Sequence, residues 1–579
     1  MAILDRKDDN LNNNYSSVKN FLKNHAISII FLILLTVIVS LITYYRILVQ
    51  IQLGAVSDSY DFLANALVFA GQGMGYSDLL RPPLFSFIIS LIFRLGYVSV
   101  TTIFYVDGGL FVFGVMGMFM LLKVRFTDLE SFLGGLLYAT FPLTLLILGF
   151  GFSDLASVSF SIWAIYLFIL AIKKNSNFFY LAFPFAMFAF LTRYNYALLI
   201  FPIIFYLLIN KDKINFKNMF GGILAAILII VPVLVLFYQK FGNFLYPFLN
   251  FGASSAAVSV SPESASYNPS IFYFIQNFPT YIGVTGLLIV LILLLGVIVY
   301  LILKFLRNRN KINIFDVLDS KSNSYKIKLS LCVALILVFL ASFGMTMYLV
   351  SELLFFVIIY ILYDLTKDRK NENIKLHLMV FVWFMTFFIF SSVFVIKSPR
   401  YFLLMTPPIV YFMILGLSKL SNILGYKFQN RNVVFSIIAL IITSVILLSS
   451  ASQIPLISHS NGDILITNEQ IQMASQWFVS YDPNYKSQNI YSDLWPNLSW
   501  YLKTDVKPVP VFKDNQTFID GVKYNTFNQA DSNQFNNYLV TNNADYYFCI
   551  RPDLNLTSYK PIKEFNNDIV GPLIIYKRV

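Results

Sequence analysis

The chain has 579 residues, of which 57% are hydrophobic and only 12% are charged, and its formal net charge is +12. A soluble protein of this length would expose far more charge, so the composition predicts that lipid surrounds most of the chain. The lysines and arginines stand in short clusters between apolar runs, which is typical of topology signals and not of a nucleic-acid-binding face. Two cysteines and three scattered histidines cannot form a disulfide framework or a cysteine-rich zinc site.

The apolar runs predict a polytopic, all-α membrane domain. After a polar tail at 1–25, the run at 26–48 is too long for the core of a signal peptide and predicts a first transmembrane helix. Together with the later runs it makes about thirteen predicted spans. The later runs lie at 101–122, 131–149, 155–172, 178–192, 194–208, 219–238, 281–306, 329–343, 345–363, 378–396, 402–418 and 433–450.

One further apolar run, at 84–95, decides the predicted orientation. As a helix it would reach only about 18 Å of the roughly 30 Å of hydrocarbon, which predicts a juxtamembrane helix in the first outer loop. The basic clusters then all fall on one side, and the positive-inside rule makes that side the cytoplasm. We therefore expect a multi-pass plasma-membrane protein with a cytoplasmic N-terminus and residues 49–100 and 451–579 outside.

The last part of the chain is more polar and predicts a soluble domain. Segments at 488–492, 544–550 and 573–576 have the character of strands, and Asn, Pro and Gly turn signals bound them. The sequence thus divides into a tail at 1–25, a membrane domain at 26–450 and a small extracytoplasmic α/β domain at 451–579.

Charged residues gather at the predicted outer boundary of the membrane, where charge is costly unless it is paired or hydrated. Each has an ordinary explanation, since aspartates cap helices and arginines and lysines anchor helices at the interface. Together, acids and bases on one face suit a charged, lipid-anchored substrate, because a carboxylate can act as a general base and guanidinium groups bind phosphate. These residues are Asp58, Asp61, Arg81, Asp154, Arg193, Lys397 and Arg400.

Six short motifs follow one another along the membrane region. They are Asp58-Ser-Tyr-Asp-Phe-Leu, Arg81-Pro-Pro-Leu, Phe152-Ser-Asp154-Leu, Leu191-Thr-Arg193-Tyr194, Phe241-Gly-Asn-Phe-Leu-Tyr246-Pro247 and Arg400-Tyr401-Phe-Leu-Leu. With these motifs in this order, the chain resembles the GT-C class of membrane glycosyltransferases, particularly the branch with protein O-mannosyltransferases and lipid A aminoarabinose transferases. It differs where members often carry Asp-Glu, here Asp58-Ser59, and where many carry Lys-Pro-Pro, here Arg81-Pro-Pro.

The resemblance implies an enzyme that moves a sugar from a polyprenyl-phosphate donor to a lipid, protein or polysaccharide acceptor on the outer face. It implies an inverting single displacement with Asp58 as the preferred general base, Asp61 as the other candidate, and Asp154 in support. The donor phosphate would be bound by Arg81, Arg400, Arg193 and Lys397. Tyr60, Tyr194, Tyr401 and Tyr246 are predicted to bind substrate.

No cofactor is predicted, because arginines can stabilise a monophosphate leaving group without a metal. Related oligosaccharyltransferases do use a metal, so a divalent cation across Asp58 and Asp154 stays open. Two other functions also stay open: a secondary transporter, although no internal repeat is found, and a non-catalytic component of glycan assembly or polymerisation. A single outward-facing cavity lined by Asp58, Arg81 and Arg400 would favour the enzyme.

Overall fold

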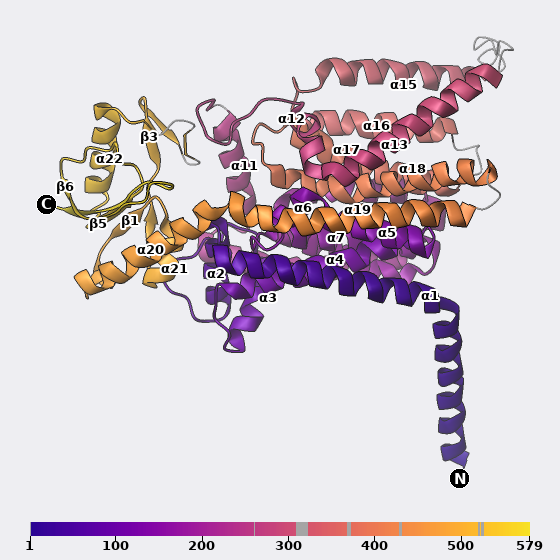
Figure 1. Ribbon diagram of the computed structural model, residues 1–579, viewed down its shortest axis with the longest axis horizontal. Helices are drawn as coiled ribbons and strands as arrows, with labels where there is room; N and C mark the ends of the chain where they lie inside the picture. The colour runs from indigo at the N-terminus through magenta and orange to yellow at the C-terminus, as the bar shows by residue number, and fades with distance from the viewer. Residues whose placement is uncertain are drawn as a thin grey trace.

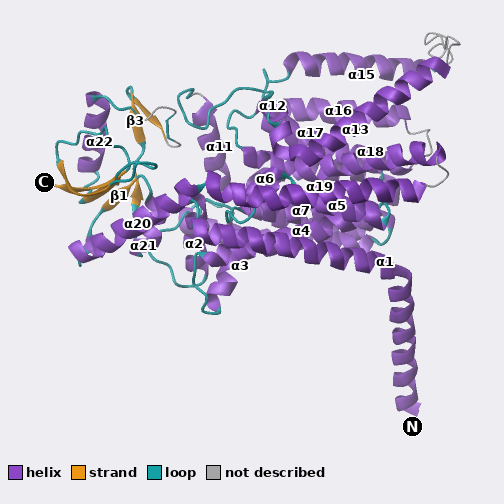
Figure 2. Cartoon of the chain, viewed as in Figure 1, coloured by secondary structure: helices purple, strands orange, loops and turns teal. Residues whose placement is uncertain are grey.

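The computed structural model shows a bundle of helices with a smaller domain at one end (Figure 1). That end, where the C-terminal domain lies, is called here the C-terminal-domain end, and the other is the opposite end. Strands occur only in the smaller domain within the part of the chain that the structure describes (Figure 2). The structure describes residues 2–259, 261–307, 322–366, 372–427, 431–518, 521–522 and 526–579.

Ten helices among the described residues are long and apolar enough to cross a membrane. They account for most of the predicted spans, because each carries a continuous apolar run of the required length. They belong to α1 (Ala2–Leu53), α4 (Thr101–Lys123), α7 (Ser153–Lys173), α10 (Phe216–Phe241), α13 (Phe278–Arg307), α15 (Asn323–Ser342), α16 (Tyr348–Thr366), α17 (Glu372–Val393), η4 with α18 (Pro399–Met405 and Thr406–Lys427) and α19 (Arg431–Ser460).

The other three predicted spans are shorter or interrupted helices. The run at 131–149 divides into α5 (Asp128–Thr140) and α6 (Pro142–Ile147), because Pro142 starts a new helix after an extended Phe141. Arg193 is likewise extended, with φ −157°, and it separates α8 (Phe179–Thr192) from η2 (Tyr194–Leu199) and α9 (Ile200–Leu208). The break at Arg193 brings this charged residue to the end of a helix.

Two short helices follow α1 at the C-terminal-domain end. They are α2 (Ser57–Phe69) and α3 (Pro83–Arg94), and α3 matches the juxtamembrane helix predicted at 84–95. Pro83 opens α3 at the first helical position, where a missing backbone N–H costs nothing. The two helices pack against each other through Phe62 and Phe85, whose rings meet edge to face.

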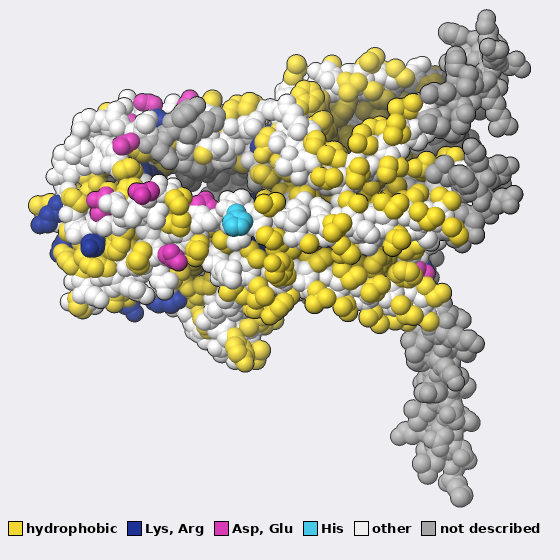
Figure 3. All heavy atoms as spheres, viewed as in Figure 1, with side chains coloured by type: hydrophobic (Ala, Val, Ile, Leu, Met, Phe, Trp, Pro, Cys, Tyr) yellow, Lys and Arg dark blue, Asp and Glu magenta, His cyan; other side chains and the backbone are white. Residues whose placement is uncertain are grey.

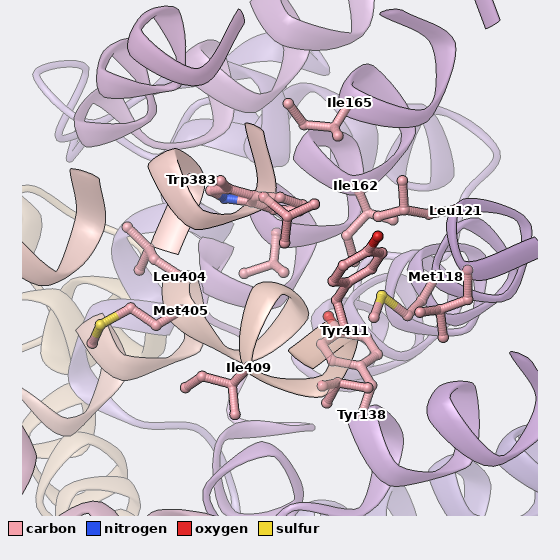
Figure 4. Packing of buried hydrophobic residues seen from close by; sticks show 14 of the residues in the cluster. Met118, Leu121, Tyr138, Ile162, Ile165, Trp383, Leu404, Met405, Ile409 and Tyr411 are labelled. Atoms are coloured by element: carbon pink, nitrogen blue, oxygen red, sulfur yellow. The ribbon is translucent and has the colours of Figure 1, made fainter. Parts of the chain in front are cut away.

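Helix α7 forms the centre of the bundle, packed between α4 and α8. Gly114 of α4 allows a close approach, since a Cβ there would collide with Ser159 of α7. The indole of Trp163 also donates to the Phe113 carbonyl at 2.9 Å. Figure 4 shows this core, in which Ile162 and Ile165 of α7 lie among side chains from α4, α5, α17 and α18.

The outer helices present apolar side chains to the surroundings, as lipid contact requires. Only 17%, 17% and 6% of the residues in the apolar windows of α1, α10 and α15 are buried inside the protein. Figure 3 shows hydrophobic side chains covering the bundle, while most of the coloured charged side chains in this view lie over the C-terminal domain. An apolar helical bundle with a small, more polar C-terminal domain is the fold class that the sequence predicts.

The C-terminal domain is the predicted small α/β unit. Its five-stranded sheet has the order β2-β1-β5-β7-β6, in which β1 pairs in parallel with β2 and β5, and β7 pairs antiparallel with β5 and β6. The three predicted strand segments correspond to β1, β5 and β7. The elements are α20 (Gly462–Tyr481), β1 (Ile490–Ser492), α21 (Trp495–Leu502), β2 (Lys507–Pro508), β3 (Val511–Lys513), β4 (Gln516–Phe518), α22 (Gln529–Thr541), β5 (Tyr546–Cys549), β6 (Tyr559–Phe565) and β7 (Leu573–Arg578).

Basic residues lie together at the opposite end of the bundle. His25, at the start of the first span, lines one cavity with Lys123, Lys173 and Lys174. The sequence has further basic clusters at 304–328, 367–375 and 419–431, and parts of these lie outside the described residues. The sequence-based orientation places this end, where basic residues gather, in the cytoplasm.

Cysteine labelling tests this orientation. Cys332 and Cys549 are buried, so an introduced cysteine should give the signal. We expect a membrane-impermeant maleimide to label Asn515→Cys, in an exposed turn of the C-terminal domain, in intact cells. Lys211→Cys, in η3 (Lys211–Lys213), should react only after permeabilisation. Labelling of Lys211→Cys in intact cells would contradict the map.

Candidate active site

A cavity of about 300 Å³ opens at the C-terminal-domain end. Its walls come from α2, the segment before α3, the start of α7, η2, α11 (Tyr246–Ser259), the end of α17, and η4. Most of the predicted site residues meet there although they are far apart in sequence. Those that line it are Asp58, Arg81, Asp154, Arg193, Tyr194, Arg400 and Tyr401.

Asp58 bridges two arginines in this cavity. It stands in the first turn of α2, whose N-cap is Val56, so Asp58 does not cap the helix. Its Oδ1 lies 3.2 Å from Arg81 Nη2, and its Oδ2 lies 2.9 Å from Arg400 Nη1. The side chains of all three residues are about one-third exposed, so a ligand in the cavity can reach each of them.

The charge of Asp58 depends on this pairing. Burial alone would raise the pKa of Asp58, but Arg81 and Arg400 outweigh it and lower the pKa to about 2. Asp58 is therefore ionised at neutral pH. It becomes more basic whenever its arginines turn to another anion.

Arg81 is shared by three carboxylates. Its Nη2 also lies 2.5 Å from Asp61 Oδ2, and its Nε lies 3.0 Å from Asp78 Oδ2. Asn65 holds the backbone of Asp78 through hydrogen bonds of 2.7 and 2.9 Å. Burial raises the pKa of Asp61 to about 6, against the opposing effect of Arg81. Asp61 contacts Arg81 but does not line the cavity, so it lies behind Arg81 as seen from the cavity.

Asp154 and Arg193 form a second, more buried ion pair. Asp154 stands in the first turn of α7, and its Oδ1 accepts a hydrogen bond from Arg193 Nη1. Its other oxygen lies 4.0 Å from Arg400, so Arg400 stands between Asp154 and Asp58. Aromatic rings support both arginines, with Arg193 5.3 Å from the Tyr401 ring centre and Arg400 4.5 Å from that of Phe152.

The loop before α7 ties the two acidic positions together. The Ser59 hydroxyl donates to the Phe150 carbonyl at 2.6 Å, which joins α2 to this loop. The Gly149 N–H donates to Asp107 of α4 at 3.1 Å. Both bonds hold the loop that leads into α7, where Asp154 lines the cavity. Asp107 was not predicted as a site residue, because its position within an apolar run does not indicate which loop its side chain contacts.

Comparison with known proteins identifies the fold that carries this cavity. Residues 80–236 match the family model of dolichyl-phosphate-mannose-protein mannosyltransferases. ArnT from Cupriavidus metallidurans, in structures with undecaprenyl phosphate and in the apo state, matches with a TM-score of 0.53 at 11% identity, over 94% of this chain and 97% of that one. This chain has the GT-C fold. The predicted resemblance is confirmed.

A second GT-C structure agrees. The apo oligosaccharyltransferase from Archaeoglobus fulgidus matches with a TM-score of 0.51 at 13% identity, over 90% of this chain and 69% of that one. No curated protein matches the chain by sequence. The family model covers Arg81, Asp154 and Arg193, whereas Asp58 and Arg400 lie outside the matched range. With this fold, the ten apolar helices found among the described residues identify a multi-pass membrane protein.

Besides Asp61, three predicted site residues lie away from the cavity lining. Lys397 donates to the carbonyls of Ser391, Ser392 and Phe394 at 2.6–2.7 Å, so it caps the end of α17 and does not line the cavity. Burial lowers the pKa of Lys397 to about 8. The remaining two are tyrosines.

Tyr60 and Tyr246 are not placed to bind substrate in the cavity. Tyr60 points to the C-terminal domain, where its hydroxyl donates to Asn468 at 3.0 Å and lies 3.2 Å from the Tyr501 hydroxyl. Tyr246 stacks on Phe241, and its neighbour Pro247 lines the cavity instead. In each of the two motifs a different residue, Asp58 or Pro247, lines the cavity.

Proposed function

We propose that this chain transfers a sugar from a polyprenyl-phosphate donor to a hydroxyl acceptor at the C-terminal-domain end of the bundle. The observation that carries the proposal is the bridging of Asp58 by Arg81 and Arg400 inside one cavity. The fold supports it, since one structure of that fold was solved with undecaprenyl phosphate.

The two arginines suit the donor phosphate. Guanidinium groups bind phosphate through paired, charge-assisted hydrogen bonds, and here two of them converge on the two oxygens of one carboxylate. A phosphate entering between them would replace Asp58 as their partner. The same contacts would stabilise the charge that grows on the phosphate as it leaves.

Binding of the donor would also prepare the base. While Arg81 and Arg400 pair with Asp58, its pKa of about 2 makes it a weak base. When the arginines turn to phosphate, the pKa of Asp58 rises toward the range of a useful general base. The acceptor hydroxyl then loses its proton to Asp58 and attacks the anomeric carbon from the face opposite the phosphate. The carbon–oxygen bond to phosphate breaks, so polyprenyl phosphate leaves and the configuration inverts.

The second ion pair would orient the reactants. Asp154 is held by Arg193 and stands beside Arg400, so it fixes the position of the arginine that contacts the phosphate. Tyr194 and Tyr401 line the cavity and offer aromatic faces to a sugar or an acceptor. The acceptor class stays open among lipid, protein and polysaccharide.

The residues present do not fit a divalent cation between Asp58 and Asp154. Arg400 contacts Asp58 and reaches within 4.0 Å of Asp154, so a cation there would lie against a guanidinium group. In the described part of the chain, no three His, Cys, Asp or Glu side chains are grouped to hold a metal. We therefore propose that the arginines stabilise the leaving phosphate without a metal.

Chelation tests this chemistry and the function together. Protein in liposomes, supplied with lipid-linked sugars and acceptors from its own cells, should transfer equally fast in EDTA and in Mg²⁺ or Mn²⁺. Loss of transfer in EDTA with recovery in Mn²⁺ would overturn the metal-free mechanism. Absence of transfer under both conditions would overturn the proposed function.

Two observations weigh against the other functions considered. The charged residues of the cavity lie at one end of the bundle, whereas a secondary transporter binds its substrate near the midplane. A non-catalytic assembly component would not need a carboxylate between two arginines. We infer that the C-terminal-domain end faces the outside, which the labelling experiment above examines.

A further inference from the structure

The C-terminal domain is joined directly to the segment that carries the acids. Helix α21 packs on α2, and Asn468 of α20 donates to the Ala55 carbonyl just before α2 at 2.9 Å. Gly75, with φ +101°, allows the segment before α3 to lie against the domain, because a Cβ there would come within 3.2 Å of the Asp505 nitrogen. This domain therefore packs against the two segments that carry Asp58 and Arg81.

One series of hydrogen bonds runs from this domain to the candidate base. The indole N–H of Trp495, the first residue of α21, donates to the Tyr76 hydroxyl oxygen at 3.2 Å. The Tyr76 hydroxyl donates to Asp61 Oδ1, and Asp61 Oδ2 lies 2.5 Å from Arg81 Nη2. That same nitrogen lies 3.2 Å from Asp58. Tyr76 and Asp61 are both buried, so these contacts are shielded from water.

We propose that Trp495, acting through Tyr76, is a positioning residue that sets how firmly Asp61 holds Arg81 and so how readily Arg81 turns to the donor phosphate. The inference rests on the proposed function and gives the C-terminal domain a role in it. A single Arg81 nitrogen serves both Asp61 and Asp58, so any change in its bond to Asp61 changes what is left for Asp58 or for phosphate.

The titration of Asp61 supplies a readout. The groups that face Asp61 are Tyr76, Asp78 and Arg81 from the segment before α3 and Asp58 from its own helix. From α21, the neutral Trp495 contacts Tyr76. Burial raises the pKa of Asp61, and the Tyr76 hydrogen bond opposes that rise because it favours the carboxylate. Below its pKa, protonated Asp61 no longer holds Arg81, so phosphate binding should tighten as the pH falls through about 6.

The signs for the variants follow from these bonds. Tyr76→Phe removes the hydrogen bond to the carboxylate, so the pKa of Asp61 rises and the binding transition moves up by about one pH unit. Trp495→Phe removes the bond that strengthens Tyr76 as a donor, so the transition moves the same way by a few tenths of a unit, roughly the size of hydrogen-bond cooperativity. If Trp495 acts through Tyr76, the double variant should match Tyr76→Phe alone.

The experiment measures binding of undecaprenyl phosphate to full-length protein in detergent between pH 5 and 8. The titration of the phosphate itself is common to every sample, so differences between variants report the protein. Trp500→Phe is the matched control, because it lies on the same helix and its ring packs against Tyr60 instead of contacting Tyr76. Its transition should stay at the wild-type pH.

The possible outcomes test the role of Trp495 and the proposed function separately. Upward shifts with Tyr76→Phe and Trp495→Phe, non-additive in the double variant and absent with Trp500→Phe, support the inference. Unshifted binding in Trp495→Phe, or shifts that add in the double variant, would overturn it and leave the proposed function standing. Failure of the wild-type chain to bind undecaprenyl phosphate at any pH would overturn the proposed function itself.

Discussion

Asp58→Asn should lower the rate of sugar transfer by at least about 10²-fold, the usual contribution of a general base. Asparagine keeps the size and shape of the side chain but cannot take the acceptor proton. Removing the carboxylate also frees Arg81 and Arg400, so binding of undecaprenyl phosphate should stay at the wild-type level or tighten. Measured on the same preparation, the transfer rate should therefore fall while phosphate binding does not weaken.

Asp61→Asn is the matched control for this prediction. Asp61 stands one helical turn further along α2 and pairs with the same arginine, but it lies behind Arg81 and does not line the cavity. Its substitution should lower transfer far less than Asp58→Asn does. An inactive Asp61→Asn beside an active Asp58→Asn would assign the base to Asp61. Normal transfer by both variants would contradict the mechanism.

Arg400→Ala and Arg81→Ala should each abolish transfer and weaken binding of undecaprenyl phosphate by about 10²-fold, since a hydrogen bond to a charged group contributes about 1.5–3 kcal/mol. Arg400→Lys should recover little. Lysine is a point charge and cannot both contact the phosphate with a planar fork and stack on the Phe152 ring. Titration of each purified variant with the lipid phosphate measures the loss.

Arg94→Ala separates a phosphate ligand from an interface anchor. Arg94 ends α3, is exposed and donates to the Phe69 carbonyl outside the cavity. Its removal should leave phosphate binding unchanged. If Arg400→Ala and Arg81→Ala bound the lipid phosphate as tightly as Arg94→Ala does, the two cavity arginines would be interface anchors. The proposed phosphate-binding site would then be wrong.

The sequence predicted the membrane region well because the signal there is local. Each apolar run can be compared by itself with the length needed to cross a membrane. The run at 84–95 is too short for that and forms the short helix α3. The site was predictable in part, because charge at a membrane boundary is rare enough to be informative. Asp58, Arg81, Asp154 and Arg400 do share one cavity.

What could not be predicted was which partner each polar residue faces. Lys397 belongs to a motif that reaches the cavity, yet its ammonium group turns back to the carbonyls that end α17. Tyr60 neighbours Ser59 but points to Asn468 in the C-terminal domain. The link from Trp495 to Tyr76 joins residues from opposite ends of the chain, and a single sequence contains no signal for such a pairing.

The most direct test of the central claim is the release of free polyprenyl phosphate. Wild-type protein in liposomes, given polyprenyl-phosphate-linked sugars and acceptor from its own cells, should release polyprenyl monophosphate in step with glycosylated acceptor, and Asp58→Asn should release at most about one hundredth as much. Acceptor glycosylation without release of the monophosphate, or equal release by both proteins, would contradict a displacement at this site with Asp58 as its base.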